Sequence, residues 1–93
     1  MVVQHKLIGG KGIFYVGKEG AILAELVYTK PSADKMNIEH TEVDESLSGK
    51  GVGLQLVSTA VTYARTHSLK IIPLCPYAKS VFDKEPAFSD VLR

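Results

Sequence analysis

A glycine-rich segment near the middle of the chain has the composition of an anion-binding loop. In residues 46–53, Ser-Leu-Ser-Gly-Lys-Gly-Val-Gly, three alternating glycines precede a stretch of helical periodicity. Glycines let the backbone approach a ligand closely, and the free N–H groups of a helix's first turn bind anions without cationic side chains. A Walker loop would need Ser or Thr after Gly-Lys, and a dinucleotide fingerprint would place its third glycine one position later. The segment therefore predicts a phosphate site of another kind, unless its glycines serve only a tight turn and close helix packing.

Few other residues suggest chemistry by their type alone. Cys75 is the single cysteine, so an internal disulfide is excluded, and one cysteine with three histidines does not indicate a metal cluster. We expect a reducing compartment, in which Cys75 is either a small buried hydrophobe or a reactive thiol. His5 and His67 have no supporting context and are expected at the surface.

Length and charge narrow the classes of function. The chain has 93 residues, 45% of them hydrophobic, which is enough for one domain spanning residues 1–93. A net charge of +1 with dispersed basic residues gives no support to a nucleic-acid surface. No apolar run approaches the roughly 20 residues that span a bilayer, and the N-terminus lacks a signal-peptide pattern. The expected location is cytoplasmic, with no membrane partner.

The first half of the chain predicts antiparallel strands. They are expected at residues 2–8, 13–16, 21–28 and 36–43, from apolar runs and period-two alternation. Glycines in residues 17–20 indicate a hairpin, and residues 31–34 indicate a loop. Alternation in the fourth strand is expected to place His40 on the face of Ile38, opposite Glu39.

The second half changes to helical periodicity. Residues 52–67 form the most regular helix pattern, with core side chains expected at Leu54, Val57, Val61 and Ala64. A strand at 70–74 and a short helix at 77–84 follow, and the tail at 87–92 either adds a strand or docks as an irregular segment. This order predicts an α+β domain with a mixed, mostly antiparallel twisted sheet of five or six strands, one long central helix and a short second helix. The crossover makes the fourth and fifth strands parallel neighbours.

The glycine segment resembles motif A of the GNAT N-acetyltransferase superfamily, which reads Q/R-x-x-G-x-G/A at the start of the helix after the fourth strand. Gly51-Val52-Gly53 matches its glycines, whereas Ser48 stands at the Gln/Arg position. Glu39-His40-Thr41 and Pro73-Leu74-Cys75-Pro76-Tyr77 are similar to segments of a compact subfamily of short, stand-alone GNAT-like acetyl-CoA-binding proteins. The resemblance covers residues 21–88 and implies a minimal GNAT-like fold.

The resemblance also implies acetyl-CoA as cosubstrate, with no metal. Its pyrophosphate would lie on backbone N–H groups of the glycine segment, and its pantetheine arm would run along the fourth strand as an added strand. The thioester carbonyl would accept a hydrogen bond from the N–H of about Val43. The implied cofactor-binding residues are Thr41, Glu42, Val43, Gly49, Lys50, Gly51, Val52, Gly53 and Leu54.

Acetyl transfer to an amine needs a base, a donor to the carbonyl oxygen and an acid for the leaving thiolate. The resemblance places the usual acid, a tyrosine, at Phe82, so that group is missing. Cys75 is a candidate nucleophile or a buried hydrophobe, and His40 is a base, a partner of Cys75 or a half-buried structural residue. Tyr77 is a substitute acid or a surface residue with a packed ring.

Two functions remain open at this point. The chain is either a small N-acetyltransferase, which transfers an acetyl group from acetyl-CoA to an unidentified amine, or a non-catalytic module that binds or senses acetyl-CoA or CoA. The missing tyrosine and the short chain favour the module. A domain without a small ligand would leave the glycine segment unexplained. We expect a monomer or a weak homodimer, because a second copy could complete the acceptor cleft.

Overall fold

Hairpin turns connect the first four strands of the sheet. The computed structural model describes residues 2–93 and places these strands at β1 (Gln4–Ile8), β2 (Lys11–Lys18), β3 (Ala21–Ser32) and β4 (Lys35–Val43). Each strand is antiparallel to the one before it. The turn between β2 and β3 has φ of 53° at Glu19 and 81° at Gly20, the left-handed values of a type I′ hairpin turn. The predicted hairpin is confirmed, with β2 extending to Lys18 instead of ending at Val16 and β3 beginning at Ala21 as expected.

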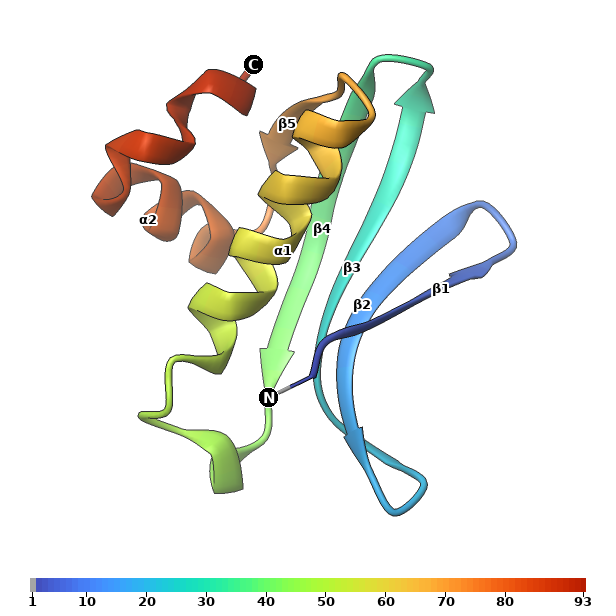
Figure 1. Ribbon diagram of the computed structural model, residues 1–93, viewed down its shortest axis with the longest axis vertical. Helices are drawn as coiled ribbons and strands as arrows, with labels where there is room; N and C mark the ends of the chain where they lie inside the picture. The colour runs from blue at the N-terminus through green and yellow to red at the C-terminus, as the bar shows by residue number, and fades with distance from the viewer. Residues whose placement is uncertain (1) are drawn as a thin grey trace.

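A helical crossover adds the fifth strand. Helix α1 (Val52–Thr66) connects β4 to β5 (Lys70–Pro73), and β5 pairs parallel to β4 in the sheet order β1-β2-β3-β4-β5. Helix α2 (Pro76–Lys84) follows and contacts α1 and β5 at that end of the sheet (Figure 1). The predicted α+β class, mixed sheet and pair of helices are therefore confirmed, with five strands.

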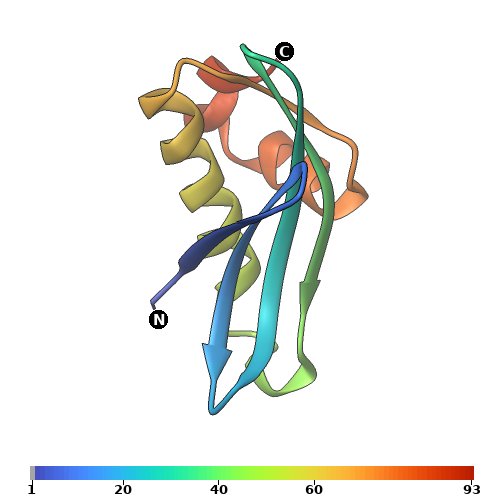
Figure 2. The ribbon, with the colours of Figure 1, turned by 90° about the vertical axis from the view of Figure 1, so that its right-hand side faces the viewer.

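Helix α1 packs along one face of the sheet, which we call the inner face (Figure 2). Alternate strand residues and one stripe of α1 form the core between them: Phe14, Val16, Ala24, Leu26, Tyr28, Met36, Ile38, Leu56, Val57, Ala60, Val61 and Ala64. Leu54 was expected in this stripe but is 40% exposed. The buried stripe is centred on Leu56, Val57 and Ala60, and at 3.6 residues per turn Leu54 falls outside it.

Five rings from distant parts of the chain meet between the inner face and the C-terminal half of α1. We call them the aromatic cluster: His5, Phe14, Tyr28, Tyr63 and His67. His5 stacks on Phe14 with ring centroids 4.3 Å apart, and its Nε2 lies 2.7 Å from the Tyr28 hydroxyl. Tyr63 packs edge-on against His5 at 5.1 Å and lies 4.2 Å from His67. Both histidines are exposed, as expected, yet they belong to a packed cluster that their sequence context did not indicate.

The connection from β3 to β4 is shorter than predicted. Strand β3 continues to Ser32, so the expected loop at residues 31–34 reduces to a turn at Ala33 and Asp34. Pro31 is tolerated in the strand because the pairing with β4 is irregular between Thr29 and Ser32. The missing N–H of proline therefore interrupts no regular ladder position.

The C-terminal tail docks mainly as a 3₁₀-helix, η2 (Pro86–Val91). Its anchor is Arg65 near the end of α1, whose guanidinium donates to Asp90 at 2.9 and 2.8 Å and to the carbonyl oxygen of Ala87 at 2.7 Å. After η2, Leu92 forms a single parallel bridge with Ile71 of β5. The tail thus combines the two expected alternatives, an irregular segment that ends in one strand-like contact.

Candidate functional site

Strands β4 and β5 separate before β4 ends. The parallel pairing stops where Ile38 meets Pro73, and the N–H groups of Leu74 and Cys75 then both donate to the Ile38 carbonyl at 3.0 Å. Strand β4 runs on to Val43, and within residues 2–93 no strand pairs with it on that side. Its free edge presents N–H and C=O groups that an extended ligand can pair with.

Helix α1 begins close to this edge with its N-terminus uncapped. The N-cap residue Gly51 has a left-handed φ of 71°, and no side chain in the described part of the chain caps the helix. Its first turn also carries no acidic residue. Free N–H groups and the positive end of the helix dipole therefore remain available to an anion.

A short 3₁₀-helix, η1 (Glu45–Leu47), turns the chain from β4 toward α1. It begins at Asp44, whose carboxylate accepts hydrogen bonds from the Ser46 N–H at 2.9 Å and the Ser46 hydroxyl at 2.6 Å. These two bonds hold the pKa of Asp44 below its usual value. The sequence Asp-Glu-Ser was a usable signal for this turn, because Asp side chains often bond the backbone two residues on.

The free edge of β4 and the start of α1 line one cavity of about 330 Å³. Its lining residues are Thr41, Val43, Leu47, Ser48, Gly49, Gly51, Val52, Gly53 and Tyr77. The predicted positions Thr41, Val43, Gly49, Gly51, Val52 and Gly53 are thus brought together. Glu42, Lys50 and Leu54 line separate depressions instead. Leu47 was not predicted to line it, although a large apolar residue in a polar loop was a signal for it.

The ring of Tyr77 lies against the first turn of α1. A Cβ atom on Gly53 would fall 2.7 Å from Tyr77 Cζ and 3.0 Å from Tyr77 Cε2, closer than side chains approach one another. Gly53 therefore provides the space that the ring occupies. Tyr77 itself is 42% exposed, so its ring forms an exposed wall of the cavity rather than part of the core.

Cys75 stands behind the cavity, at the N-cap of α2. It is 7% exposed and does not line the cavity. Burial raises the pKa of its thiol, but the nearby Ala78 N–H, Thr41 hydroxyl, Tyr77 N–H and Thr41 N–H favour the thiolate, outweigh that effect and bring the pKa below its usual value. The Thr41 oxygen is itself buried and has no hydrogen-bond partner of regular geometry, so its effect on the thiol is electrostatic. Thr41 thus links the thiol to the cavity.

His40 does not lie on the face that the sequence indicated. Between Val27↔His40 and Tyr28↔Ile38 the register with β3 shifts by one residue, so Glu39 is the extra residue of a β-bulge. The bulge ends the alternation that put His40 with Ile38 on the inner face. His40 is exposed on the outer face, where its Nε2 lies 3.1 Å from a Glu42 carboxylate oxygen.

Glu25 on β3 lies close to this pair. One ligand-type atom from each of Glu25, His40 and Glu42 falls within 4.8 Å of the others, a spacing that a metal ion could bridge. Counting only histidines and cysteines in the sequence missed this group, because β3 supplies one of its members. Exposed carboxylates often gather in this way without a metal, and we assign no ion to them.

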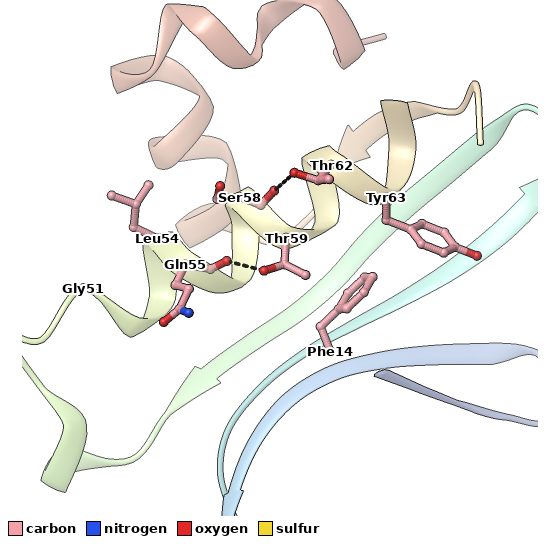
Figure 3. A pocket seen from close by; sticks show the side chains of 8 residues that line it. All are labelled: Phe14, Gly51, Leu54, Gln55, Ser58, Thr59, Thr62 and Tyr63. Atoms are coloured by element: carbon pink, nitrogen blue, oxygen red, sulfur yellow. Dashed lines mark hydrogen bonds between the residues drawn. The ribbon is translucent and has the colours of Figure 1, made fainter. Parts of the chain in front are cut away.

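A second, larger hollow runs along the solvent side of α1. It measures about 560 Å³ and extends from Gly51 to the rings of Phe14 and Tyr63 (Figure 3). Hydroxyl side chains between these ends are bonded back to the helix, Thr59 to the Gln55 carbonyl at 2.8 Å and Thr62 to the Ser58 carbonyl at 3.1 Å. Gly51 lines both hollows, so they meet at the start of α1.

Comparison with known proteins identifies the class to which this fold and cavity belong. The family model described as GCN5-related N-acetyl-transferase matches residues 13–91, which is most of the chain. The chain belongs to this family of GNAT acetyltransferases. No curated protein matches the sequence.

Solved structures agree with that assignment. A GCN5-like protein from Staphylococcus aureus, studied in solution by NMR, is 38% identical, with a TM-score of 0.77 over 97% of this chain and 87% of that one. A GNAT family acetyltransferase from Elizabethkingia anophelis with acetyl-CoA bound has a TM-score of 0.65 at 13% identity, over 84% of this chain and 54% of that one. The IAA acetyltransferase from Bacillus cereus has a TM-score of 0.65 at 20% identity, over 82% and 54%. The last two likenesses concern the fold alone, and this chain spans about half the length of those enzymes.

The helices of the structure can be compared with the thickness of a membrane. None of the helices formed by residues 2–93 is both long enough and apolar enough to cross a bilayer.

Proposed function

We propose that this chain binds acetyl-CoA in the cavity between β4 and α1 and transfers its acetyl group to an amine. The observation that carries the proposal is that an unpaired strand edge and an uncapped helix N-terminus line the same cavity. Pantetheine has two amides that a strand edge can pair with, and pyrophosphate is an anion suited to a helix N-terminus. Membership in the acetyltransferase family supports the same reading.

The parts of the ligand follow from these two features. Pyrophosphate would lie on the N–H groups from Gly49 to Gly53, and the pantetheine amides would pair with β4 beside Thr41 and Val43. The thioester then lies nearer the point where β4 and β5 separate, and the N–H of Thr41, the outward-facing N–H closest to that point on the free edge, donates to its carbonyl oxygen. A donor placed there stabilises the negative charge that develops on that oxygen during attack.

The reaction itself needs little covalent chemistry from the protein. The amine nitrogen attacks the thioester carbonyl carbon, a C–N bond forms, the C–S bond breaks, the amine loses a proton and the CoA thiolate gains one. We assign the acid to the hydroxyl of Tyr77, because Tyr77 lines the cavity and is exposed, with the Cys75 thiol behind Thr41 as the alternative donor. His40 can serve as the base only for an amine that arrives from the outer face, where Glu42 holds its imidazole.

Binding is tested by calorimetric titration with acetyl-CoA. The informative variant is Gly51→Val, and its matched control is Gly20→Val in the β2–β3 turn. Both glycines have a left-handed φ, 71° and 81°, and both leave open space for a side chain, so the backbone strain is alike. We expect Gly51→Val to weaken binding about 10-fold or more and Gly20→Val to change it less than about 2-fold. No heat from the unmodified protein at millimolar acetyl-CoA, or equal losses in the two variants, would overturn the proposal.

The role of Cys75 is tested separately by intact-mass measurement after incubation with acetyl-CoA. A stable acetyl adduct that disappears in Cys75→Ala would replace direct transfer by a covalent acetyl-cysteine route. Without an adduct, turnover that falls in Cys75→Ala and does not recover in Cys75→Ser, whose hydroxyl is too weak an acid to replace a thiol, would support Cys75 as the acid.

The alternative, a binding or sensing module, draws on one specific observation. Phe82 is 5% exposed and packs against Phe88, so no hydroxyl exists where the resemblance places the usual acid. Sustained CoA release above the buffer rate across a panel of amines would eliminate the module. Tight binding with no release for any amine would favour it.

A further inference from the structure

The two edges of the sheet differ in how far the rest of the chain covers them. At the β5 edge, the Arg93 N–H donates to the Ile71 carbonyl at 3.1 Å, and Leu92 bridges to Ile71, so the C-terminus covers part of that edge. Strand β1 forms the other edge, and no segment among residues 2–93 pairs with its free side. An unpaired edge strand is a template for pairing with another chain.

The side chains of this edge are unusually apolar for a free surface. Val2 is 78% exposed, Leu7 71% and Ile8 53%, which makes them three of the most exposed large apolar residues in the described chain. Proteins commonly protect an edge strand with proline, a bulge or charges. Strand β1 has neither proline nor bulge, and its one charge, Lys6, lies over the Tyr15 ring with its Nζ 4.9 Å from the centroid.

The residue pattern around His5 is symmetric. Reading residues 2–8 as Val-Val-Gln-His-Lys-Leu-Ile, two apolar residues and one polar residue stand on each side of the histidine. Two antiparallel copies with a two-fold axis at His5 would place Val2 opposite Ile8, Val3 opposite Leu7 and Gln4 opposite Lys6. A self-complementary surface of this kind is what a two-fold interface requires.

The backbone favours the same register. The β1–β2 turn closes on Ile8 and Lys11, with the left-handed Gly9 at φ 59°, so this closing pair is a hydrogen-bonded one. Alternation along an antiparallel ladder then turns the N–H and C=O groups of His5 and Leu7 toward the free side, and a strand extended by pairing would add those of Val3. A two-fold axis at His5 pairs these outward groups with one another, whereas an axis at Lys6 would pair fewer of them and would set Lys6 against its own copy.

We propose that β1 is a homodimer interface, in which two copies of the chain pair their β1 strands antiparallel about a two-fold axis at His5 and join their sheets edge to edge. The occupant is a second copy because the edge is complementary to itself in side-chain pattern and in backbone polarity. A single strand pair buries less than a standard interface, so the dimer dissociates at roughly micromolar concentrations or above.

Sedimentation velocity from about 10 μM to about 1 mM tests the proposal, with Leu7→Lys as the informative variant and Ile22→Lys as its control. Ile22 is another exposed apolar residue, 43% accessible, and lies in a different hairpin. Leu7 is too exposed for its replacement to unfold the chain, and circular dichroism checks this. We expect self-association that weakens about 10-fold or more in Leu7→Lys and is unchanged in Ile22→Lys. A monomer across the whole range, or a dimer that Leu7→Lys leaves intact, would overturn it.

Cysteine cross-linking tests the register. In a Cys75→Ala background, residues on the two-fold axis approach their own copies at a distance that a disulfide can span. We expect His5→Cys to cross-link faster than Lys6→Cys and Leu7→Cys. Faster cross-linking at Lys6 or Leu7, or none at any of the three positions, would contradict the proposed axis.

Discussion

The two ends of α1 are built on opposite principles. At the N-terminus, the N-cap residue Gly51 has no side chain to cap the helix, other glycines line the same cavity, and the neighbouring edge of β4 is unpaired. At the C-terminus, Arg65 is bonded to Asp90 and Ala87, and Tyr63 packs into the aromatic cluster. One end leaves backbone groups free, and the other end satisfies its polar groups internally.

This difference separates binding from stability within one helix. Free N–H groups and an unpaired strand edge contribute little to folding, but they are the groups that a ligand can complete. The packed rings and the Arg65 contacts contribute mainly to folding, because these groups already have partners within the chain. Changes at the two ends should therefore affect different measurements.

The largest effect is expected at the stable end. Phe14 is 3% exposed and stacks on His5, so Phe14→Ala should lower the free energy of unfolding by about 3–5 kcal/mol in urea denaturation. Because that change can unfold a domain of this size, Phe14→Leu serves as a milder companion. Acetyl-CoA affinity of the folded Phe14→Leu protein should remain within about 2-fold of the original. If Phe14→Leu lowered the affinity for acetyl-CoA together with the free energy of unfolding, binding and stability would not be separate functions of the two ends of α1.

The next effect is expected at the binding end. Gly53→Ala places a methyl group where the Tyr77 ring lies, and the exposed ring can swing away. Unfolding free energy should change by less than about 1 kcal/mol, because alanine also favours the helix. Acetyl-CoA affinity should fall about 10-fold in calorimetry, since the methyl group and the displaced ring narrow the cavity. In a Tyr77→Ala background the same substitution should cost less, and equal costs in both backgrounds would contradict this account.

A pH-dependent effect should follow from the aromatic cluster. Burial, and then repulsion from His67, lower the pKa of His5 from 6.5, while Tyr28 and Tyr63 also face it. The unfolded chain therefore binds a proton first, so the free energy of unfolding should fall as the pH drops below 6.5. Urea denaturation of a dilute solution, repeated at intervals of about one pH unit from about pH 5 to about pH 8, measures this change in the free energy of unfolding. His5→Gln should make the free energy of unfolding less dependent on pH. An unchanged pH dependence in that variant would show that a group other than His5 causes it.

The smallest effect is expected for the exposed ion pair. Asp90→Asn removes a charge from the Arg65 contact, whose two side chains are 44% and 55% exposed. Solvent screens such pairs, so the denaturation midpoint should fall less than in Phe14→Leu. Acetyl-CoA affinity should not change, which distinguishes this end of α1 from the Gly53 end.

Most of the fold could be predicted from local sequence patterns. Apolar runs, alternation and helical periodicity predicted the strands and both helices, and the helical crossover predicted the parallel β4–β5 pair. The tendency of proline to end regular structure misplaced the end of β3, since the irregular pairing around Pro31 depends on the partner strand. Leu54 was placed in the core because apolar character alone does not fix the centre of the buried stripe.

The site was predicted less completely, for a similar reason. Glycines and the strand edge could be located from local sequence and family resemblance, and they do line one cavity. The face that His40 occupies could not be predicted from local sequence, because the bulge at Glu39 is a property of the pairing with β3. The aromatic cluster unites His5 with His67, and only the folded chain brings these two residues together.

The bulge at Glu39 changes which residues of β4 share a face of the sheet. Ile38 and Thr41 face the same side although an odd number of positions separates them, and His40 and Glu42 take the opposite side. Deleting Glu39 would restore strict alternation and leave both faces as they are, with Thr41 still on the side of Cys75 and His40 still outside. Relatives whose fourth strand differs in length by one residue should therefore be aligned by the face each residue occupies, because a gap placed one position away would compare cavity residues with outer-face residues.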